Sequence, residues 1–437
     1  MLKEVKNKNL VIGILCAVIL TFLFPYFASA NEADDYDSVI IKPKAKLLKS
    51  KRMNRLMYRS GVSSYRVIKD DLYVVSLDAN STNEIKQAKI DELQKTGLFE
   101  LVEPDYKFSL DQNPPEREYV RIIHLPVNSS TSETTTNIDN NSSSAGPSVK
   151  EVTPNDKDFS SQYYLREINA TKAWNLTTGD SLLVVGVLDT GVDEKHPDLN
   201  GRISGGNPTV DLSDEIGHGT AVSGIVSANT NNNEGIAGIS WNTKILSLMV
   251  TDENGQAKVS TVVSALDDAY KNGAMILQIS LSTNQFSQTL KDAIQQAKER
   301  NILIIASAGN TGITEARYPA AFDGVIGVGA VEENKEIASY STRGDHVELV
   351  APGTNIYTTA PGSSYRKVSG TSFAAPQATG AAALVWSIAP SLTNKEVENI
   401  LINSTDDLGI PGKDPDYGNG LLNIQKAVEM AKEKTGK

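Results

Sequence analysis

The stretch "SLLVVGVLD", Ser181 to Asp189, decides the fold class of this 437-residue chain. It is apolar almost throughout, so it does not fit a strand with one face in water. Similar runs follow, with helix-like segments between them: "TKILSLMV", "AMILQISLS", "NILIIASAGN" and "GVIGVGAV". The pattern predicts an α/β domain over residues 159–437, with a parallel sheet and helices on both faces. Ligands of such sheets bind beyond the carboxyl ends of the strands, so the residues that end these runs matter most.

The chain before this domain reads differently. Strand-like and helix-like segments alternate over residues 31–110, which predicts a small α+β module of the ferredoxin-like type. The stretch Asn128 to Ser148 consists mainly of serine, threonine and asparagine and has almost nothing to bury. We therefore expect residues 111–158 to be a linker that proteases can reach.

The N-terminus has the features of a secretion signal. Three lysines precede the apolar run Leu10 to Phe24, and the small residues Ala28 to Ala30 follow it. This predicts a signal peptide over residues 1–30 and a secreted mature protein; an uncleaved membrane anchor is the alternative. The single cysteine, Cys16, lies in this segment, so the mature chain would have no disulfide and no thiol chemistry.

The overall charge limits the partners of the chain. The formal net charge is -11 and the pI is near 5.1. Nucleic acids and anionic membranes would repel such a chain, so we expect no nucleic-acid partner and membrane contact only through the signal segment.

Four short motifs carry the residues of a nucleophilic catalyst. They are "GVLDTGVD" with Asp189, "GHGTAVSGIVSA" with His218, "ASAGN" with Asn310 and "SGTSFAAP" with Ser372. A serine hydroxyl needs an imidazole to take its proton, and the imidazole needs a carboxylate to hold its tautomer. Each residue alone has an ordinary structural explanation, such as a helix cap or a turn. Their occurrence together in one domain favours catalysis.

These motifs resemble those of the subtilisin family of serine peptidases, the subtilases. The resemblance implies that Asp189 is the orienting acid, His218 the general base and Ser372 the nucleophile, with Asn310 as an oxyanion donor. It also implies that residues 31–110 are a propeptide that assists folding and inhibits the enzyme, and that the chain is a self-cleaving zymogen. Catalysis would need no cofactor. The secreted form and the linker are most similar to the lanthipeptide (lantibiotic) leader peptidases of Gram-positive bacteria.

The resemblance further implies where a substrate lies. The lining residues would be Ser280, Leu281, Ser282 and Gly255. Arg317 stands before a Tyr-Pro pair where most family members have a small residue. In the pocket for P1, the residue before the cleaved bond, its guanidinium would favour an acidic side chain, Glu first. Arg317 in solvent is the alternative. Self-cleavage is expected after Glu100, or secondarily after Glu103.

A structural calcium ion is a further expectation from the family. The expected ligands are Gln162, Asp198, Asn232, Glu234 and Ile236. Oxygen ligands suit calcium, but Asn-rich segments also form ordinary turns, so both interpretations remain.

Two other functions are weighed against a leader peptidase. A general extracellular scavenging protease fits the same fold and secretion signal. A catalytically inactive binding module would keep the fold, although each member of the triad is present in this sequence.

Overall fold

The computed structural model describes residues 36–44, 57, 62, 64–69, 71–78, 81–111, 150–206 and 213–436. The predicted signal peptide and most of the predicted linker lie outside the described residues. Among the described residues, none of the helices has the length and apolar character needed to span a membrane.

The large domain is built on a parallel sheet, as the apolar runs predict. Its seven strands lie in the order β14-β13-β12-β10-β6-β8-β7, and every neighbouring pair is parallel. The strands are β6 (Val184–Asp189), β7 (Ile203–Gly206), β8 (Lys244–Met249), β10 (Ile276–Ile279), β12 (Leu303–Ser307), β13 (Val325–Val331) and β14 (Val347–Pro352). The quoted run therefore lies inside the sheet, between β10 and β8.

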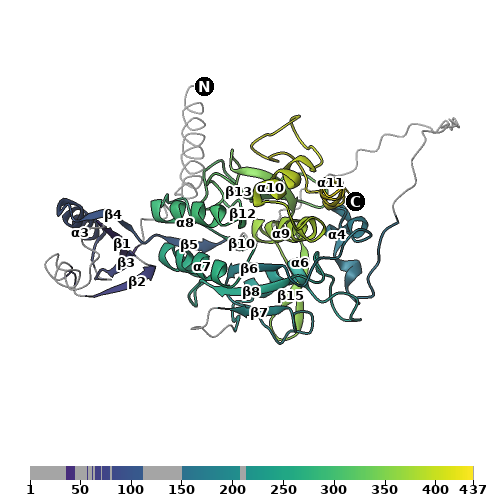
Figure 1. The fold of residues 1–437 in the computed structure, drawn as a ribbon, viewed down its shortest axis with the longest axis horizontal. Helices are drawn as coiled ribbons and strands as arrows, with labels where there is room; N and C mark the ends of the chain where they lie inside the picture. Colours follow the sequence, from purple (N-terminus) through teal and green to yellow (C-terminus); the bar gives the residue numbers. More distant parts are fainter. Residues whose placement is uncertain are drawn as a thin grey trace, which may run out of the picture.

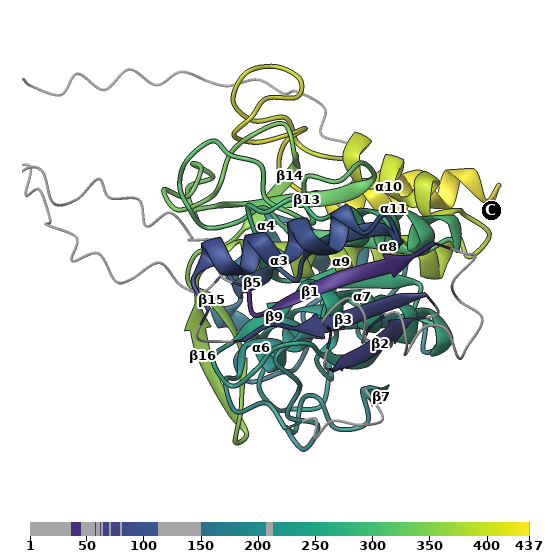
Figure 2. The same ribbon diagram turned by 90° about the vertical axis from the view of Figure 1, so that its left-hand side faces the viewer.

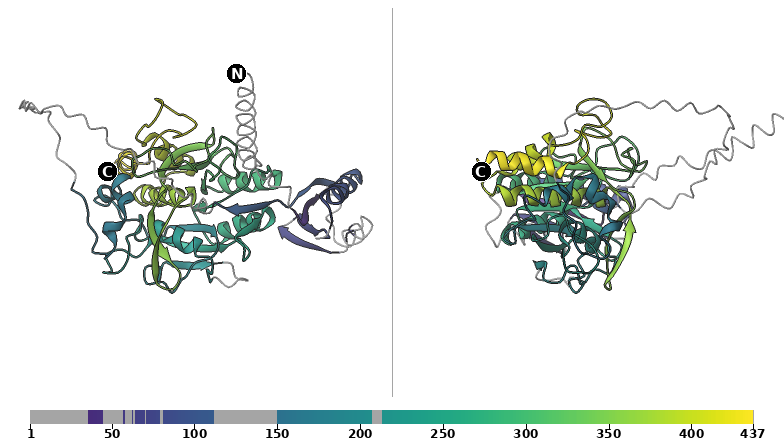
Figure 3. Two further views of the ribbon diagram at one scale, coloured as in Figure 1. Left: turned by 180° about the vertical axis from the view of Figure 1, so that it is seen from behind. Right: turned by 90° about the vertical axis from the view of Figure 1, so that its right-hand side faces the viewer.

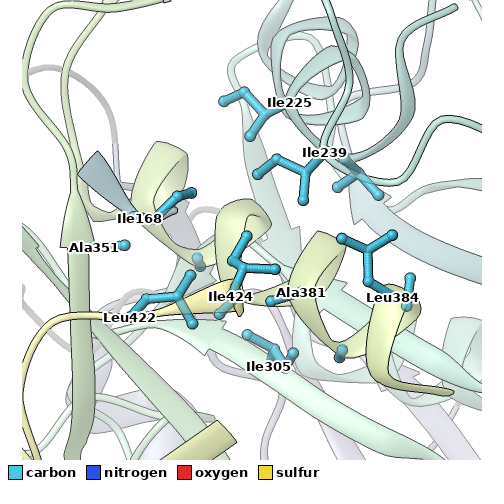
Figure 4. Packing of buried hydrophobic residues seen from close by; sticks show 14 of the residues in the cluster. Ile168, Ile225, Ile239, Ile305, Ala351, Ala381, Leu384, Leu422 and Ile424 are labelled. Carbon is cyan, nitrogen blue, oxygen red and sulfur yellow. The ribbon is translucent and has the colours of Figure 1, made fainter. Parts of the chain in front are cut away.

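Helices cover both faces of this sheet, because successive strand residues point to opposite sides. On one face, Leu303 and Ile305 of β12 pack in the core cluster that contains α6, α9 and α11 (Figure 4). On the other, Ile304 and Ala306 pack with α7 and α8. The helices are η2 (Phe159–Ser161), α4 (Tyr163–Glu167), α5 (Ala170–Ala173), α6 (His218–Ser227), α7 (Val259–Lys271), α8 (Gln288–Glu299), α9 (Thr371–Ile388), α10 (Asn394–Asn403) and α11 (Ile424–Lys434).

Among its described residues, the N-terminal module contains a four-stranded antiparallel sheet and the helix α3. Its order is β2-β3-β1-β4, which is compatible with the predicted ferredoxin-like arrangement. Its elements are β1 (Ser38–Pro43), β2 (Tyr65–Lys69), β3 (Leu72–Ser76), α3 (Asn83–Lys95) and β4 (Phe99–Pro104). Ile41, Ile90 and Leu93 belong to a core of its own. Figure 2 shows the module end-on, and Figure 3 shows it at the opposite end of the molecule from the C-terminus.

Two carboxylates of the module bind the first turns of helices in the large domain. Glu103 accepts hydrogen bonds from the backbone N–H groups of Gln288 (3.0 Å) and Thr289 (3.1 Å) at the start of α8. Asp105 accepts from the backbone N–H (2.8 Å) and hydroxyl (2.7 Å) of Ser260 in α7. Backbone N–H groups at a helix N-terminus favour negative charge, so these contacts fix the module against α7 and α8.

A strand then leaves the module and enters the large domain. This strand, β5 (Lys107–Leu110), forms a small antiparallel sheet in the order β11-β5-β9, and Figure 1 shows it between α7 and α8. Its neighbours are β9 (Gln256–Lys258) and β11 (Leu281–Ser282), while β15 (Ile356–Ala360) and β16 (Ser364–Val368) form a separate hairpin. Phe108 of β5 is fully buried among residues of the α7 and α8 face.

Candidate active site

The acid and the base lie at the ends of two elements. Asp189 is the last residue of β6, and His218 is the first residue of α6. Their side chains are buried, and His218 Nδ1 lies 2.7 Å from Asp189 Oδ1. An ionised carboxylate at that distance holds the proton on Nδ1, which leaves Nε2 as the basic atom.

The residue after the histidine must be glycine for this pair to form. A Cβ on Gly219 would lie 2.1 Å from the carbonyl oxygen of Gly191 and 3.2 Å from Asp189 Oδ1. The first of these distances is far below van der Waals contact, so a side chain here would push the start of α6 away from β6. The glycine of the "HGT" motif therefore serves the close approach of His218 to Asp189.

The nucleophile lies in the first turn of α9, and a piece of the same chain lies against it. The Ser372 hydroxyl is 3.2 Å from the carbonyl oxygen of Asp111, the residue that follows β5, and 3.2 Å from that of Ser280. His218 Nε2 is buried and has no hydrogen-bond partner among the described residues. Proton transfer therefore requires the Ser372 hydroxyl to turn toward Nε2.

Asn310 holds the carbonyl group that Ser372 faces. Its Nδ2 donates to the Asp111 carbonyl oxygen at 2.7 Å. Its Oδ1 accepts from the backbone N–H (3.0 Å) and hydroxyl (2.9 Å) of Thr371, so the amide group has only one workable orientation. Gly370 leaves room for this approach, because its Cβ would lie 3.1 Å from the Asp111 oxygen at a φ of +147°. The donor is thus in place before charge develops on that oxygen.

Replacing Asn310 tests this role. We expect Asn310→Asp to lower kcat by about 100- to 1,000-fold, because a carboxylate keeps the acceptor for Thr371 but removes the donor to the oxyanion. KM for a peptide substrate should change little. Asn310→Ala also removes the contact with Thr371, so similar losses in both variants would assign the effect to the donor. Near-normal kcat in the aspartate variant would contradict it.

The side chain of Asp111 occupies a polar pocket. Its two carboxylate oxygens accept hydrogen bonds from Ser282 Oγ and Ser307 Oγ, both at 2.7 Å. Arg317 is 4 % exposed and its Nε donates to Ser282 Oγ at 3.1 Å, so it lies in the pocket wall and not in solvent. Burial raises the pKa of the Asp111 carboxyl, while the Ser282 hydroxyl and the Arg317 charge act in the opposite direction.

The main chain before Asp111 is bound on both sides. Leu110 pairs with Leu281 and Ser109 with Ser282 on β11, and β9 pairs with the other edge of β5. The predicted lining residues 280–282 are therefore beside the bound segment, and Ser280 Oγ also donates to the Ser372 carbonyl at 3.1 Å. Gly255 lies instead in the turn that precedes β9, one residue outside the pairing.

The structure brings neither predicted cleavage residue to Ser372. Glu100 lies in β4 and is 3.6 Å from Lys42, and Glu103 binds the start of α8. Asp111 lies at Ser372 instead, because the chain continues beyond β4 as β5, which pairs with β9 and β11 and ends next to the nucleophile. Sequence reasoning missed Asp111 and Ser307. The available signal was an acidic residue at the end of "YKFSLD", where the strand-like pattern of the module stops.

The expected calcium ligands do not form an open oxygen site. The Asp198 oxygens accept from the Asn232 side-chain amide (2.8 Å), the Ile236 backbone N–H (2.8 Å) and the Tyr365 hydroxyl (3.0 Å). Gln162 Oε1 accepts from the Ala237 backbone N–H, and Glu234 pairs with a lysine at the surface. No group of three or more acidic, histidine or cysteine side chains suited to a metal occurs within the described ranges. In this arrangement the Asp198 oxygens accept hydrogen bonds from protein donors, and the calcium site stays a prediction.

Comparison with known proteins agrees with the fold and the site. The sequence pattern of the Subtilase family matches residues 180–420. The chain is 36% identical to thermitase of Thermoactinomyces vulgaris over 282 residues, which cover 63% of this chain and 99% of thermitase. It is 36% identical to subtilisin BL of Lederbergia lenta over 268 residues (60% and 97%). It is 37% identical to the thermophilic serine proteinase of Bacillus sp. strain AK1 over 281 residues (63% and 69%). The chain therefore belongs to the subtilase family, and it is a serine endopeptidase with an Asp-His-Ser triad.

Proposed function

We propose that this protein is a secreted zymogen that cuts its own chain after Asp111 and then cleaves other peptides after an acidic residue. The observation that carries the proposal is the position of Asp111. Its carbonyl lies against Ser372 and Asn310, while its carboxylate lies in the pocket with Ser282, Ser307 and Arg317. A bound segment in this place has the arrangement of a substrate before cleavage.

The chemistry of self-cleavage follows from these contacts. His218 Nε2 takes the proton of the Ser372 hydroxyl as Oγ bonds to the Asp111 carbonyl carbon, and Asn310 holds the resulting oxyanion. The intermediate collapses to an acyl-enzyme as the Asp111–Gln112 bond breaks, and His218 gives its proton to the departing Gln112 nitrogen. Water, activated by His218, then releases the Asp111 carboxylate. Gln112 itself lies outside the described residues.

The bound segment also suggests the wider substrate. Phe108, Ser109, Leu110 and Asp111 occupy the positions from P4 to P1, and Phe108 and Leu110 are buried in the site. A peptide with the sequence Phe-Ser-Leu-Asp is therefore the natural test substrate. We therefore propose self-cleavage after Asp111 in place of the predicted cleavage after Glu100 or Glu103.

As the physiological substrate we propose a lanthipeptide precursor, from which the enzyme removes the leader. A pocket with a buried arginine supports a narrow specificity over general digestion, because few peptide side chains match it. General proteolysis remains the second candidate, since the similar proteins include a thermitase and a subtilisin. Efficient cleavage of casein at many apolar sites would favour that second function. Cleavage of a precursor only at an acidic leader terminus would favour the first.

Arg317 provides the direct test of acidic specificity. We expect wild-type kcat/KM for Phe-Ser-Leu-Asp to exceed that for Phe-Ser-Leu-Leu by about a hundredfold or more, since an acid buried without a cation is strongly disfavoured. Arg317→Ser should remove most of this difference and spare the leucine peptide. Arg166→Ser is the control outside the pocket, because Arg166 is largely exposed and lies 3.6 Å from Glu151. A wild-type enzyme with no acidic preference would overturn the proposal.

A further inference from the structure

Two serine hydroxyls from different strands bracket the P1 carboxylate. Ser282 belongs to β11 and Ser307 to β12, and both side chains are fully buried. Each hydroxyl donates to a different oxygen of Asp111, at 2.7 Å in both cases. Both carboxylate oxygens are therefore bound by hydroxyl groups on two different strands.

The donor direction of Ser282 is fixed by Arg317. Because Arg317 Nε donates to Ser282 Oγ at 3.1 Å, the hydroxyl hydrogen of Ser282 is left for the carboxylate. The guanidinium is in turn held by Glu315, whose Oε1 lies 3.5 Å from one terminal nitrogen. Arg317 thus supplies positive charge and orients a hydroxyl, while Glu315 lies beside the same guanidinium with Asp111 in the pocket.

The main chain of the P1 residue is fixed as firmly as its carboxylate. Asn310 binds its carbonyl oxygen at 2.7 Å, and the pairing of Leu110 with Leu281 sets the strand register. The distance from the backbone to the two serines is therefore set to the length of an aspartate side chain. A glutamate, which is one methylene longer, would have to buckle, lose a serine or move its carbonyl off Asn310.

We infer that the P1 pocket selects aspartate over glutamate, and that Ser307 and Ser282 determine this choice by binding the carboxylate at a fixed depth. The inference rests on the proposed function and adds a preference for the length of the acidic side chain at P1. Ser307 is the new specificity residue, because its hydroxyl binds the Asp111 carboxylate. From the apolar run "NILIIASAGN" alone, this serine is expected only to be part of a strand.

The test compares Phe-Ser-Leu-Asp, Phe-Ser-Leu-Glu and Phe-Ser-Leu-Leu as matched fluorogenic peptides. We expect wild-type kcat/KM to be about 10- to 200-fold higher for aspartate than for glutamate. Ser307→Ala should lower kcat/KM for the aspartate peptide by about tenfold or more and leave the leucine peptide within a few-fold, which compresses the aspartate-to-glutamate ratio. Ser247→Ala is the matched control, since it removes an equally buried hydroxyl from β8 outside the pocket.

The full chain gives a second readout that needs no change to the pocket. Asp111→Glu should slow self-cleavage at this bond by a similar factor, measured by mass spectrometry of the chain over time. Equal use of aspartate and glutamate, with both far above leucine, would overturn the inference and leave the proposed function standing. Loss of any acidic preference would overturn the proposed function itself. An unchanged ratio in a folded Ser307→Ala enzyme would remove Ser307 from the specificity.

Discussion

The Ser372→Ala variant should accumulate as an uncut precursor in which the Asp111–Gln112 bond is intact. The alanine cannot form the acyl bond, and we expect the rate of self-cleavage to fall on the order of a millionfold. The bound segment should remain in place, because the contacts of Asp111 with Asn310, Ser282 and Ser307 do not involve the Ser372 side chain. N-terminal sequencing and intact mass of the purified protein give the result.

A control and a kinetic measurement complete this test. Ser369→Ala changes a nearby serine of the same motif, whose Oγ accepts from the Asn355 backbone N–H, and should leave processing normal. In wild type, the rate of cleavage should not depend on protein concentration, because β5 pairs with β9 and β11 of its own chain. Cleavage of the Ser372→Ala variant at the same bond, in a preparation without other proteases, would show that another enzyme matures this protein.

The catalytic residues could be predicted from the sequence because each lies in a short local motif. Asp189 ends an apolar strand, and His218 and Ser372 begin helices that are rich in small residues. Such arrangements are encoded within a few residues of the catalytic side chain. The parallel sheet could also be predicted from the sequence, since strands buried on both faces must be apolar throughout.

The residue bound at the nucleophile could not be predicted in the same way. Asp111 reaches Ser372 only because β5 pairs with β9 and β11, which lie about 150 and 170 residues later in the chain. No local sequence pattern near Asp111 predicts how β5 pairs with β9 and β11. In the sequence, Glu100 is the first candidate and Glu103 the second, whereas in the fold Glu103 binds the start of α8.

The expected calcium site shows a second limit of prediction from sequence. The sequence supplies Asp198 and nearby oxygen-bearing residues, which suggests a cation. In the fold, the Asn232 amide and the Tyr365 hydroxyl donate to that carboxylate, and Tyr365 comes from the distant hairpin of β15 and β16. Whether an acidic side chain binds metal or hydrogen-bond donors depends on such tertiary partners, which spacing does not reveal.

The Asp189→Asn variant should lose about 10,000-fold in kcat while it keeps its fold and most of its substrate affinity. Asp189 Oδ1 accepts from both His218 Nδ1 (2.7 Å) and the Thr190 backbone N–H (2.8 Å), in a buried position. An asparagine that keeps its oxygen there offers no charge to the imidazolium that forms when Ser372 is deprotonated. One that turns its amide toward Nδ1 instead stabilises the tautomer in which Nε2 carries the proton and cannot accept another.

Both orientations of the asparagine thus lower kcat. Steady-state kinetics on the peptide Phe-Ser-Leu-Asp would measure this loss. Asp193→Asn is the matched control, because the Asp193 carboxylate accepts from the backbone N–H groups of Lys195 and Gly362 and lies outside the triad. Its kcat should stay near wild type. A loss below tenfold for Asp189→Asn would remove Asp189 from the catalytic unit. Because the triad acts as one unit, adding Asp189→Asn to Ser372→Ala should cost no further activity, whereas additive losses would mean that Asp189 acts elsewhere in the enzyme.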